Sequence, residues 1–161
     1  MPLWPAVTPS GSFLCPPTQY APGSQTTLSV TSLTFAAFSS ANVSTGAFNA
    51  PPSGTVLVTA SFMPTMPTIA PAAFALAAHG TVTPLIGNAI QGELANNTTF
   101  QPTTLQFLVT GLTAGTSYNF DLLGATGNAS DALEIIAFQM TATTITAGNR
   151  GGPVVMTVQA V

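Results

Sequence analysis

Apolar and polar residues alternate over short runs along most of the chain that follows residue 25. The run "TVLVTASFM" shows the pattern most clearly, because the side chains of a β-strand point to opposite faces in turn. Four apolar residues of this run share one predicted face: Val56, Val58, Ala60 and Phe62. In "TTLQFLVTGL" the same pattern places three residues on one face: Leu105, Phe107 and Val109. Each run therefore predicts a strand with one buried face.

Similar runs recur through the rest of the sequence, separated by Gly, Pro and Asn. We predict further strands in these runs: "TTLSVTSLTFAAF", "NVSTGAF", "AIQGEL", "SYNFDLLGA", "DALEIIAFQMTATTI" and "PVVMTVQAV". The alternation slips by one position near Thr31 and Ser32, which predicts a bulge or a break there. No segment shows a helical stripe. About nine or ten short strands with Gly and Pro turns are typical of a β-sandwich or a barrel.

Two segments between these runs follow a less regular pattern. The stretch "AAFALAAHGTVTPLIG" combines helix-favouring Ala and Leu with turn-forming Gly80 and Pro84, and its short length favours strands around a turn. The stretch "PTMPTIAP" holds three prolines. We predict a loop there, because proline supplies no amide donor to a sheet.

Two of the late runs assign particular side chains to faces. Tyr118 shares one side of its run with Phe120 and Leu122, directly after the turn "GLTAGTS". A tyrosine in this place can bury its ring while its hydroxyl forms a hydrogen bond with a backbone group. We therefore expect Tyr118 to be structural and not a ligand-binding residue. In the last long run, strict alternation predicts two opposed sets: Leu133, Ile135, Ala137 and Gln139 against Glu134, Ile136, Phe138 and Met140.

Residues 1–25 form a segment of different composition, with six of the fourteen prolines. Proline resists both helix and central strand, so we predict an extended arm over residues 1–25 and a β-sandwich domain over residues 26–161. The arm holds aromatic and apolar side chains that are costly to leave in water: Trp4, Phe13, Leu14 and Tyr20. We expect these four residues to contact another chain.

Charge is almost absent from the sequence, which excludes several classes of partner. Charged residues make up 3% of the chain, against about 25% in ordinary soluble domains, while threonine occurs 26 times. A single arginine, Arg150, is too little to neutralise nucleic-acid phosphates. The longest apolar run, residues 70–78, has about half the length of a membrane-spanning helix. The first residues lack the basic and apolar regions of a secretory signal. We therefore expect no nucleic acid, no membrane and no signal peptide.

The few ionisable side chains form no recognisable catalytic or metal-binding motif. His79 is the only histidine, and no second His or Cys stands near it as a metal ligand would. Asp131 and Glu134 are three residues apart, so a strand would point them to opposite faces. A Ser-His-Asp triad would have to combine His79 with Asp121 or Asp131. We expect a surface or core-edge place for His79 and burial of the lone Cys15. We predict no catalytic, cofactor-binding or metal-binding residues.

Three stretches carry a resemblance to a known family. "FNAPPSGTVLVTASF" resembles the element of C1q/TNF-like jelly rolls in which a proline-rich turn and a glycine precede a long core strand. "LVTGLTAGTSYNFDLLGA" looks like the two late strands and tight turn of such domains, and "DALEIIAFQMTA" like their closing strand. Domains with these motifs are similar to virion proteins of tailed bacteriophages, particularly those of actinobacteria. The resemblance implies a jelly-roll-like antiparallel β-sandwich that serves in head decoration or in the tail.

A second resemblance competes with the first. The stretch "VTGLTAGTSYNF" also looks like the turn and tyrosine strand of fibronectin type III domains, where a tyrosine anchors the corner. Against it, the chain is far longer than one such module, and its only tryptophan lies in the arm and not in an early core strand.

Together these observations lead to one expectation and one alternative. An apolar-rich surface with almost no charge associates unless subunit contacts cover it, so we expect a homotrimer or another symmetric homo-oligomer. We expect an all-β, jelly-roll-like sandwich that acts as a structural, non-enzymatic capsid decoration protein of the virion. Its expected partners are other copies and the major capsid or a tail protein, with no cofactor. The alternative is a receptor- or carbohydrate-binding module at a tail fibre or tail tip, for which few residues are available: Trp4, Tyr20, Asp121 and Asp131.

Overall fold

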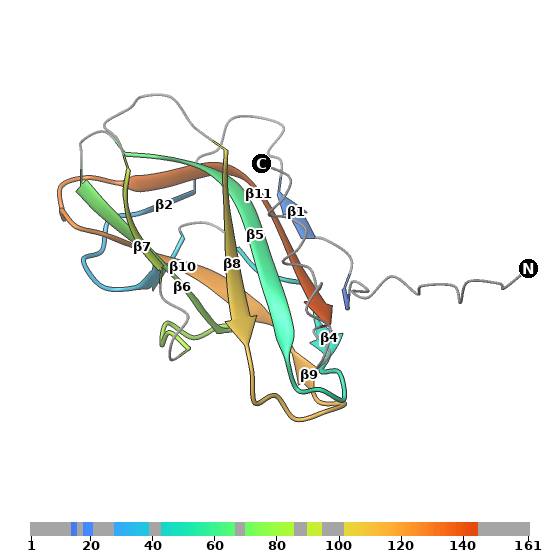
Figure 1. The fold of residues 1–161 in the computed structure, drawn as a ribbon. Coiled ribbons are helices and arrows are strands. Elements are labelled where there is room, and N and C mark those ends of the chain that lie inside the picture. The colour runs from blue at the N-terminus through green and yellow to red at the C-terminus, as the bar shows by residue number, and fades with distance from the viewer. Residues whose placement is uncertain are drawn as a thin grey trace, which may run out of the picture.

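A computed structural model describes residues 14–15, 18–20, 28–38, 43–66, 70–85, 90–94 and 102–144. Within this part the chain forms eleven β-strands and no helix (Figure 1). The strands are, in chain order, β1 (Thr18–Tyr20), β2 (Leu28–Val30), β3 (Ala36–Ala37), β4 (Phe48–Asn49), β5 (Val56–Thr65), β6 (Ala70–Ala78), β7 (Ile90–Leu94), β8 (Thr103–Val109), β9 (Ser117–Tyr118), β10 (Phe120–Thr126) and β11 (Leu133–Thr144).

The strands build two antiparallel sheets and one small pair. Sheet A has the order β1-β11-β5-β8, with β2 also paired to β11, and sheet B has the order β3-β10-β6-β7. The small pair is β4 with β9. Along the chain, successive strands cross repeatedly between the sheets: β2 to β3, β5 to β6, β7 to β8, β8 to β10 and β10 to β11. This winding is that of a jelly roll, so the expected all-β, jelly-roll-like sandwich is confirmed.

The two sheets enclose one apolar core. The predicted inner face of β5 is confirmed, because all four of its residues are buried: Val56, Val58, Ala60 and Phe62. On β8 the predicted face is confirmed as well, with Phe107 and Val109 buried and Leu105 packed against the core. The ring of Phe62 lies against that of Phe74 on β6, with 4.9 Å between their centroids, so this contact joins the sheets. Burial of each such side chain stabilises the fold by roughly 1.5–3 kcal/mol.

The predicted break near Thr31 and Ser32 is the place where the chain crosses between sheets. Before it β2 ends at Val30 in sheet A, and after it β3 begins at Ala36 in sheet B. The carbonyl of Ser32 accepts a 2.8 Å hydrogen bond from the amide of Thr126. The slip in alternation therefore marks a change of sheet.

Strict alternation along β11 is wrong beyond Ile135. Leu133 and Ile135, from one predicted set, are buried, but Met140 and Ala142, which have the opposite parity, are buried as well. The pairing of β11 with β5 shifts between Ile135 and Phe138. Such a bulge inserts an extra residue and moves the following side chains to the other face. Because "EIIAFQM" is apolar on both faces, the pattern does not reveal the bulge.

The predicted loop "PTMPTIAP" is wrong at both ends, because Pro64 belongs to β5 and Pro71 to β6. Pro64 lies opposite Ile135, next to the bulge, where a missing amide donor is tolerated. Pro71 lies one residue beyond the ladder between β6 and β10, which ends at Ala72. The strands predicted on both sides of this segment are confirmed, including β6 with its following turn and β7. The strand predicted in "PVVMTVQAV" lies outside the described residues.

Part of the predicted arm lines one edge of sheet A. The strand β1 pairs Tyr20 with Phe138 of β11, and the amide of Leu14 donates a 2.9 Å hydrogen bond to the carbonyl of Ala142. Cys15 is buried in the core, as predicted. Together with β2, these segments cover the side of β11 that faces away from β5. We call this side of sheet A the closed edge.

Candidate functional site

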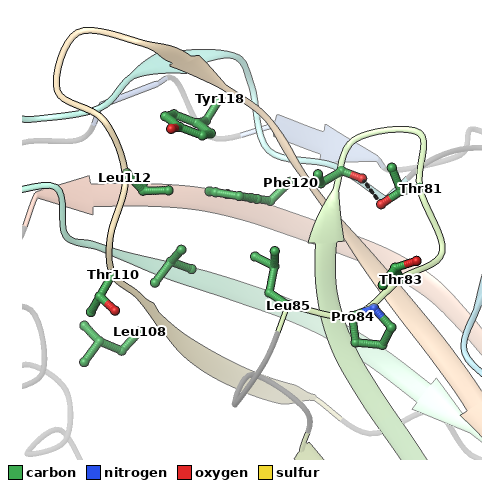
Figure 2. A pocket seen from close by; sticks show the side chains of 11 residues that line it. Thr81, Thr83, Pro84, Leu85, Leu108, Thr110, Leu112, Tyr118 and Phe120 are labelled. Carbon is green, nitrogen blue, oxygen red and sulfur yellow. Dashed lines mark hydrogen bonds between the residues drawn. The ribbon is translucent and has the colours of Figure 1, made fainter.

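A cleft opens at the opposite edge of the sandwich, where sheet A ends in β8. It has a volume of about 620 Å³ and lies between two walls, residues 108–112 at the end of β8 and the segment 81–85 that follows β6 (Figure 2). Tyr118 and Phe120 complete its lining. We call this feature the edge cleft.

The edge cleft is apolar, and among the described residues no carboxylate, imidazole or cation lines it. The side chains of Leu85, Leu112 and Phe120 lie between the two walls (Figure 2). Leu108 is 53% exposed, a high value for so large an apolar side chain. Three threonines add hydroxyls to the lining: Thr81, Thr83 and Thr110. Such a surface can bind apolar side chains and form a few hydrogen bonds, but it holds no group that transfers protons at neutral pH.

Hydrogen bonds hold the segment 81–85 against β6. The hydroxyl of Thr81 donates to the carbonyl of Ala78 at 2.8 Å, which closes the turn after β6. The amide of Leu85 donates to the carbonyl of Leu76, also at 2.8 Å. This wall of the edge cleft is therefore positioned by the fold of the chain itself.

The other wall is held where two turns dock on each other. The amide of Leu112 donates to the carbonyl of Gly54 at 3.0 Å, and the amide of Gly115 donates to the carbonyl of Ala50 at 2.8 Å. Gly54 has a φ of 62°, and a Cβ at this position would lie 2.6 Å from the carbonyl oxygen of Leu112. Only glycine permits this approach. The stretches "FNAPPSG" and "GLTAGTSY", which are distant in the sequence, thus form one structural unit.

Tyr118 has the structural contacts that its place in the sequence predicts. Its hydroxyl accepts a 3.1 Å hydrogen bond from the amide of Thr113. Its ring stacks on that of Phe120, with 6.1 Å between the centroids, and packs against the core. The hydroxyl thereby closes the turn that follows the wall at Leu112, while the ring contributes to the edge cleft.

A polar cluster lies next to the segment 81–85, around the carboxylate of Asp121. This side chain is only 3% exposed, so its charge requires hydrogen-bond partners. Ser44 Oγ donates to Oδ1 at 2.6 Å, and the amide of Gly80 donates to Oδ2 at 2.8 Å. His79 Nδ1 lies 2.7 Å from Oδ1. The cluster joins three segments of the chain, and one of them leads directly into the wall of the edge cleft.

The order of contacts in this cluster differs from that of a Ser-His-Asp triad. In a triad the imidazole lies between the serine and the carboxylate, so that it can take the proton of the serine hydroxyl. Here the carboxylate of Asp121 lies between Ser44 and His79. The imidazole is about half exposed, as expected for a residue at the edge of the core. The cluster therefore holds segments together and does not activate Ser44.

Asp131 and Glu134 do not converge with Asp121. Asp131 lies beyond the other end of β10, where its Oδ2 accepts a 2.9 Å hydrogen bond from Asn128 Nδ2. Glu134 lies in β11. The described part of the chain contains no group of three or more His, Cys, Asp or Glu that could hold a metal ion.

The predicted partner-contact residues of the arm are only partly within the described residues. Leu14 is half-buried and packs against the core of its own chain, and Tyr20 pairs with Phe138 through the backbone. Trp4 and Phe13 lie outside the described residues. The described part of the arm therefore contacts its own sandwich at the closed edge.

Sequence reasoning did not predict the edge cleft. Its walls come from residues 81–85 and 108–112, and no pattern within either segment shows that they face each other. Two features of the sequence could have pointed to these walls: the turn residues Gly80 and Pro84, and the lack of charge in both segments.

No protein-family model matches the chain, and no curated protein matches it. In the described part, no helix is long and apolar enough to cross a membrane.

Proposed function

We propose that this chain is a structural protein of a bacteriophage virion, and that it decorates the capsid through apolar and hydrogen-bonded contacts. The observation that carries the proposal is the edge cleft. Its lining combines exposed Leu108 with threonine hydroxyls and lacks carboxylate, imidazole and cation among the described residues. This chemistry is suited to adhesion and not to a reaction at a bound substrate.

Two further observations support the proposal. The jelly-roll fold is the one that the resemblance to bacteriophage virion proteins implies, although a fold alone hosts many functions. The chain also contains only five acidic and basic residues, four carboxylates and one arginine. A surface of this kind associates with other surfaces mainly by burying apolar area.

The proposal includes oligomerisation and excludes catalysis. Among the described residues, the large apolar side chains with the highest exposure are Leu33, Val82 and Leu108. Contacts with other copies, in the form of a homotrimer, and with the major capsid protein or a tail protein would cover Leu108 and the edge cleft beside it. The Asp121 carboxylate, the most buried ionisable group of the polar cluster, is engaged by Ser44, His79 and Gly80 in holding the fold.

The experiment has two stages. Antibodies raised against the full chain are used for immunogold labelling of purified virions, which shows whether the protein is present and whether it lies on the head or the tail. Purified variants are then added to virions assembled without the chain, and their occupancy is measured. Leu108→Asp places a charge in the edge cleft, and Leu33→Asp is its matched control, because Leu33 is 61% exposed and lies outside the cleft.

We expect labelling of the head, full occupancy by the parent chain and by Leu33→Asp, and about tenfold weaker binding by Leu108→Asp, or roughly 1.4 kcal/mol. Virions without label would overturn the proposal. Equal occupancy of both variants would show that the edge cleft has no part in it.

The second candidate is a receptor- or carbohydrate-binding module of the tail, and one observation favours it. The edge cleft combines the ring of Tyr118 with three threonine hydroxyls, and such a combination of an aromatic ring and hydroxyl groups can bind a sugar. Against it, the hydroxyl of Tyr118 is engaged by Thr113, and Asp121 and Asp131 lie apart. Label at the tail tip together with glycan binding that Leu108→Asp abolishes would favour this candidate.

A further inference from the structure

We infer that the edge cleft of each subunit receives the N-terminal arm of a neighbouring copy, and that the Trp4 side chain enters it. The inference rests on the homo-oligomer of the proposed function and names the surface that forms it. Four properties of the chain support it: the place where the arm begins, its length, its chemistry and the symmetry that results.

The arm begins on the side of the sandwich that faces away from the edge cleft. Leu14 is bonded to Ala142 at the closed edge. In the order β1-β11-β5-β8, this edge and β8 are the two opposite margins of sheet A. Residues 1–13 therefore start from the margin that is farthest from their own edge cleft.

The length of the arm suits a neighbouring subunit. Thirteen residues precede Leu14, and an extended chain of that length spans about 40 Å. Pro2, Pro5 and Pro9 favour an extended course. To reach its own edge cleft the arm would have to cross the width of sheet A, from β11 to β8. A neighbour whose edge cleft lies against the closed edge would receive the arm without that crossing.

The chemistry of the arm matches that of the cleft. The stretch "MPLWPAVTPSGSF" contains no charged side chain, and none of the described residues that line the edge cleft is charged. Trp4 offers a large apolar ring together with one N–H donor, which the hydroxyls of Thr81, Thr83 or Thr110 can accept. Tryptophan is enriched among the residues that dominate binding energy at interfaces. The volume of about 620 Å³ is in the range of pockets that enclose small molecules of roughly 300–1,000 Å³.

The symmetry of the contact follows from its two different surfaces. The arm leaves its own subunit at the closed edge, whereas the cleft that receives a neighbour's arm lies at the opposite edge. A contact between unlike surfaces can repeat head to tail, and it closes into a ring when the rotation between subunits allows closure. It therefore agrees with the trimer of the proposed function.

The single tryptophan of the chain provides a direct probe of this inference. Fluorescence of Trp4 and molecular mass by light scattering are measured on the full chain over a dilution series. We expect a blue-shifted emission, protected from acrylamide, in the oligomer, and a red-shifted, quenchable emission once dilution produces monomers. Far-UV circular dichroism checks that each variant is folded.

Three variants sharpen the measurement. Leu108→Asp alters the edge cleft, and Trp4→Ala alters the arm that enters it. Each variant should raise the protein concentration at which half of the oligomer dissociates by about tenfold, equivalent to roughly 1.4 kcal/mol. In Leu108→Asp the emission of Trp4 should also shift to the red. Leu33→Asp, with comparable exposure outside the cleft, should behave like the parent chain.

Each opposite outcome overturns the inference. A blue-shifted emission that persists in the monomer places Trp4 within its own chain. An exposed Trp4 in the oligomer, or an oligomer of Leu108→Asp as stable as the parent, places the arm elsewhere. These results are separate from the proposed function. A stable oligomer with buried Trp4 that is absent from virions contradicts only the proposed function. Label on the head together with a stable oligomer in which Trp4 is exposed contradicts only this inference.

Discussion

The two margins of sheet A differ in how they are covered. At the closed edge, short segments of the arm and β2 pair with β11 and turn apolar side chains inward, so that Cys15 and Leu28 are buried. At the other margin, β8 pairs among the described residues only with β5, and Leu108 is half exposed beside the edge cleft. The ion pair of His79 with Asp121 belongs to sheet B and lies at neither margin of sheet A.

The difference shows that an uncharged edge requires a cover of some kind. Proteins usually protect an edge strand by charge, proline, a bulge or a covering segment. The run "TTLQFLV" of β8 has neither charge nor proline. The closed edge is covered by its own chain, whereas among the described residues the β8 margin borders the edge cleft. The turns that dock at Gly54 hold one wall of this cleft in place.

The largest expected effect comes from truncating one leucine at each margin. Leu28→Ala at the closed edge should lower the free energy of unfolding by about 4 kcal/mol, because Leu28 is fully buried and its loss leaves a cavity. Leu108→Ala should change it by no more than about 0.5 kcal/mol, since that side chain is largely in water. Chemical denaturation of both variants measures the contrast. Equal losses would mean that β8 is covered like the closed edge.

A second pair of variants tests the support of the edge cleft at Tyr118. Tyr118→Ala should cost about 3 kcal/mol through a cavity beside Phe120, while Tyr118→Phe should cost about 1 kcal/mol through loss of the bond to Thr113. Thermal unfolding of both, with virion occupancy measured in parallel, separates support from ligand contact. Normal stability of Tyr118→Ala with lost attachment would assign the ring to binding.

The docked turns can be tested with two glycines of similar backbone conformation. Gly54→Ala should cost about 2 kcal/mol, because φ is positive and the new Cβ meets the carbonyl of Leu112. Gly115→Ala, where φ is 76° and the space is open, should cost only the conformational strain, about 1 kcal/mol. Urea unfolding gives both values. Identical losses would show that the contact with Leu112 adds nothing.

The smallest expected effect is that of salt. At about 1 M the Debye length falls to about 3 Å, which screens exposed ion pairs. With one arginine in the chain and no charge among the described residues of the edge cleft, the oligomer and its attachment to virions should persist unchanged. Light scattering and occupancy at low and high salt test this. Release by salt alone would identify an electrostatic interface and contradict the apolar one.

The strands and their faces could largely be predicted, because alternation is a local property with a period of two. This holds for Val56 to Phe62 on β5 and for Phe107 and Val109 on β8. It also holds for Tyr118, whose place after a tight turn predicts a bond from its hydroxyl to the backbone. The prediction failed at the bulge in β11, where apolar residues on both faces hide the change of parity.

The candidate site could be predicted much less well. Ser44 and Asp121 are 77 residues apart, and His79 and Asp121 are 42 apart. Their contact depends on how loops from different strands meet at one end of the sandwich. The edge cleft likewise needs two segments that share no sequence pattern. The sequence indicated only that any such site would contain few charged side chains.

The sequence by itself determined that this chain folds as β-strands joined by Gly and Pro turns, because alternation and turn chemistry act between neighbouring residues. It also determined that the surface carries almost no charge. Only the tertiary structure decided which edge the chain covers with its own arm and which it leaves beside a cleft. That choice depends on the long-range register of β11 against β5, β1 and β2, which packing of the whole core selects and no local pattern encodes.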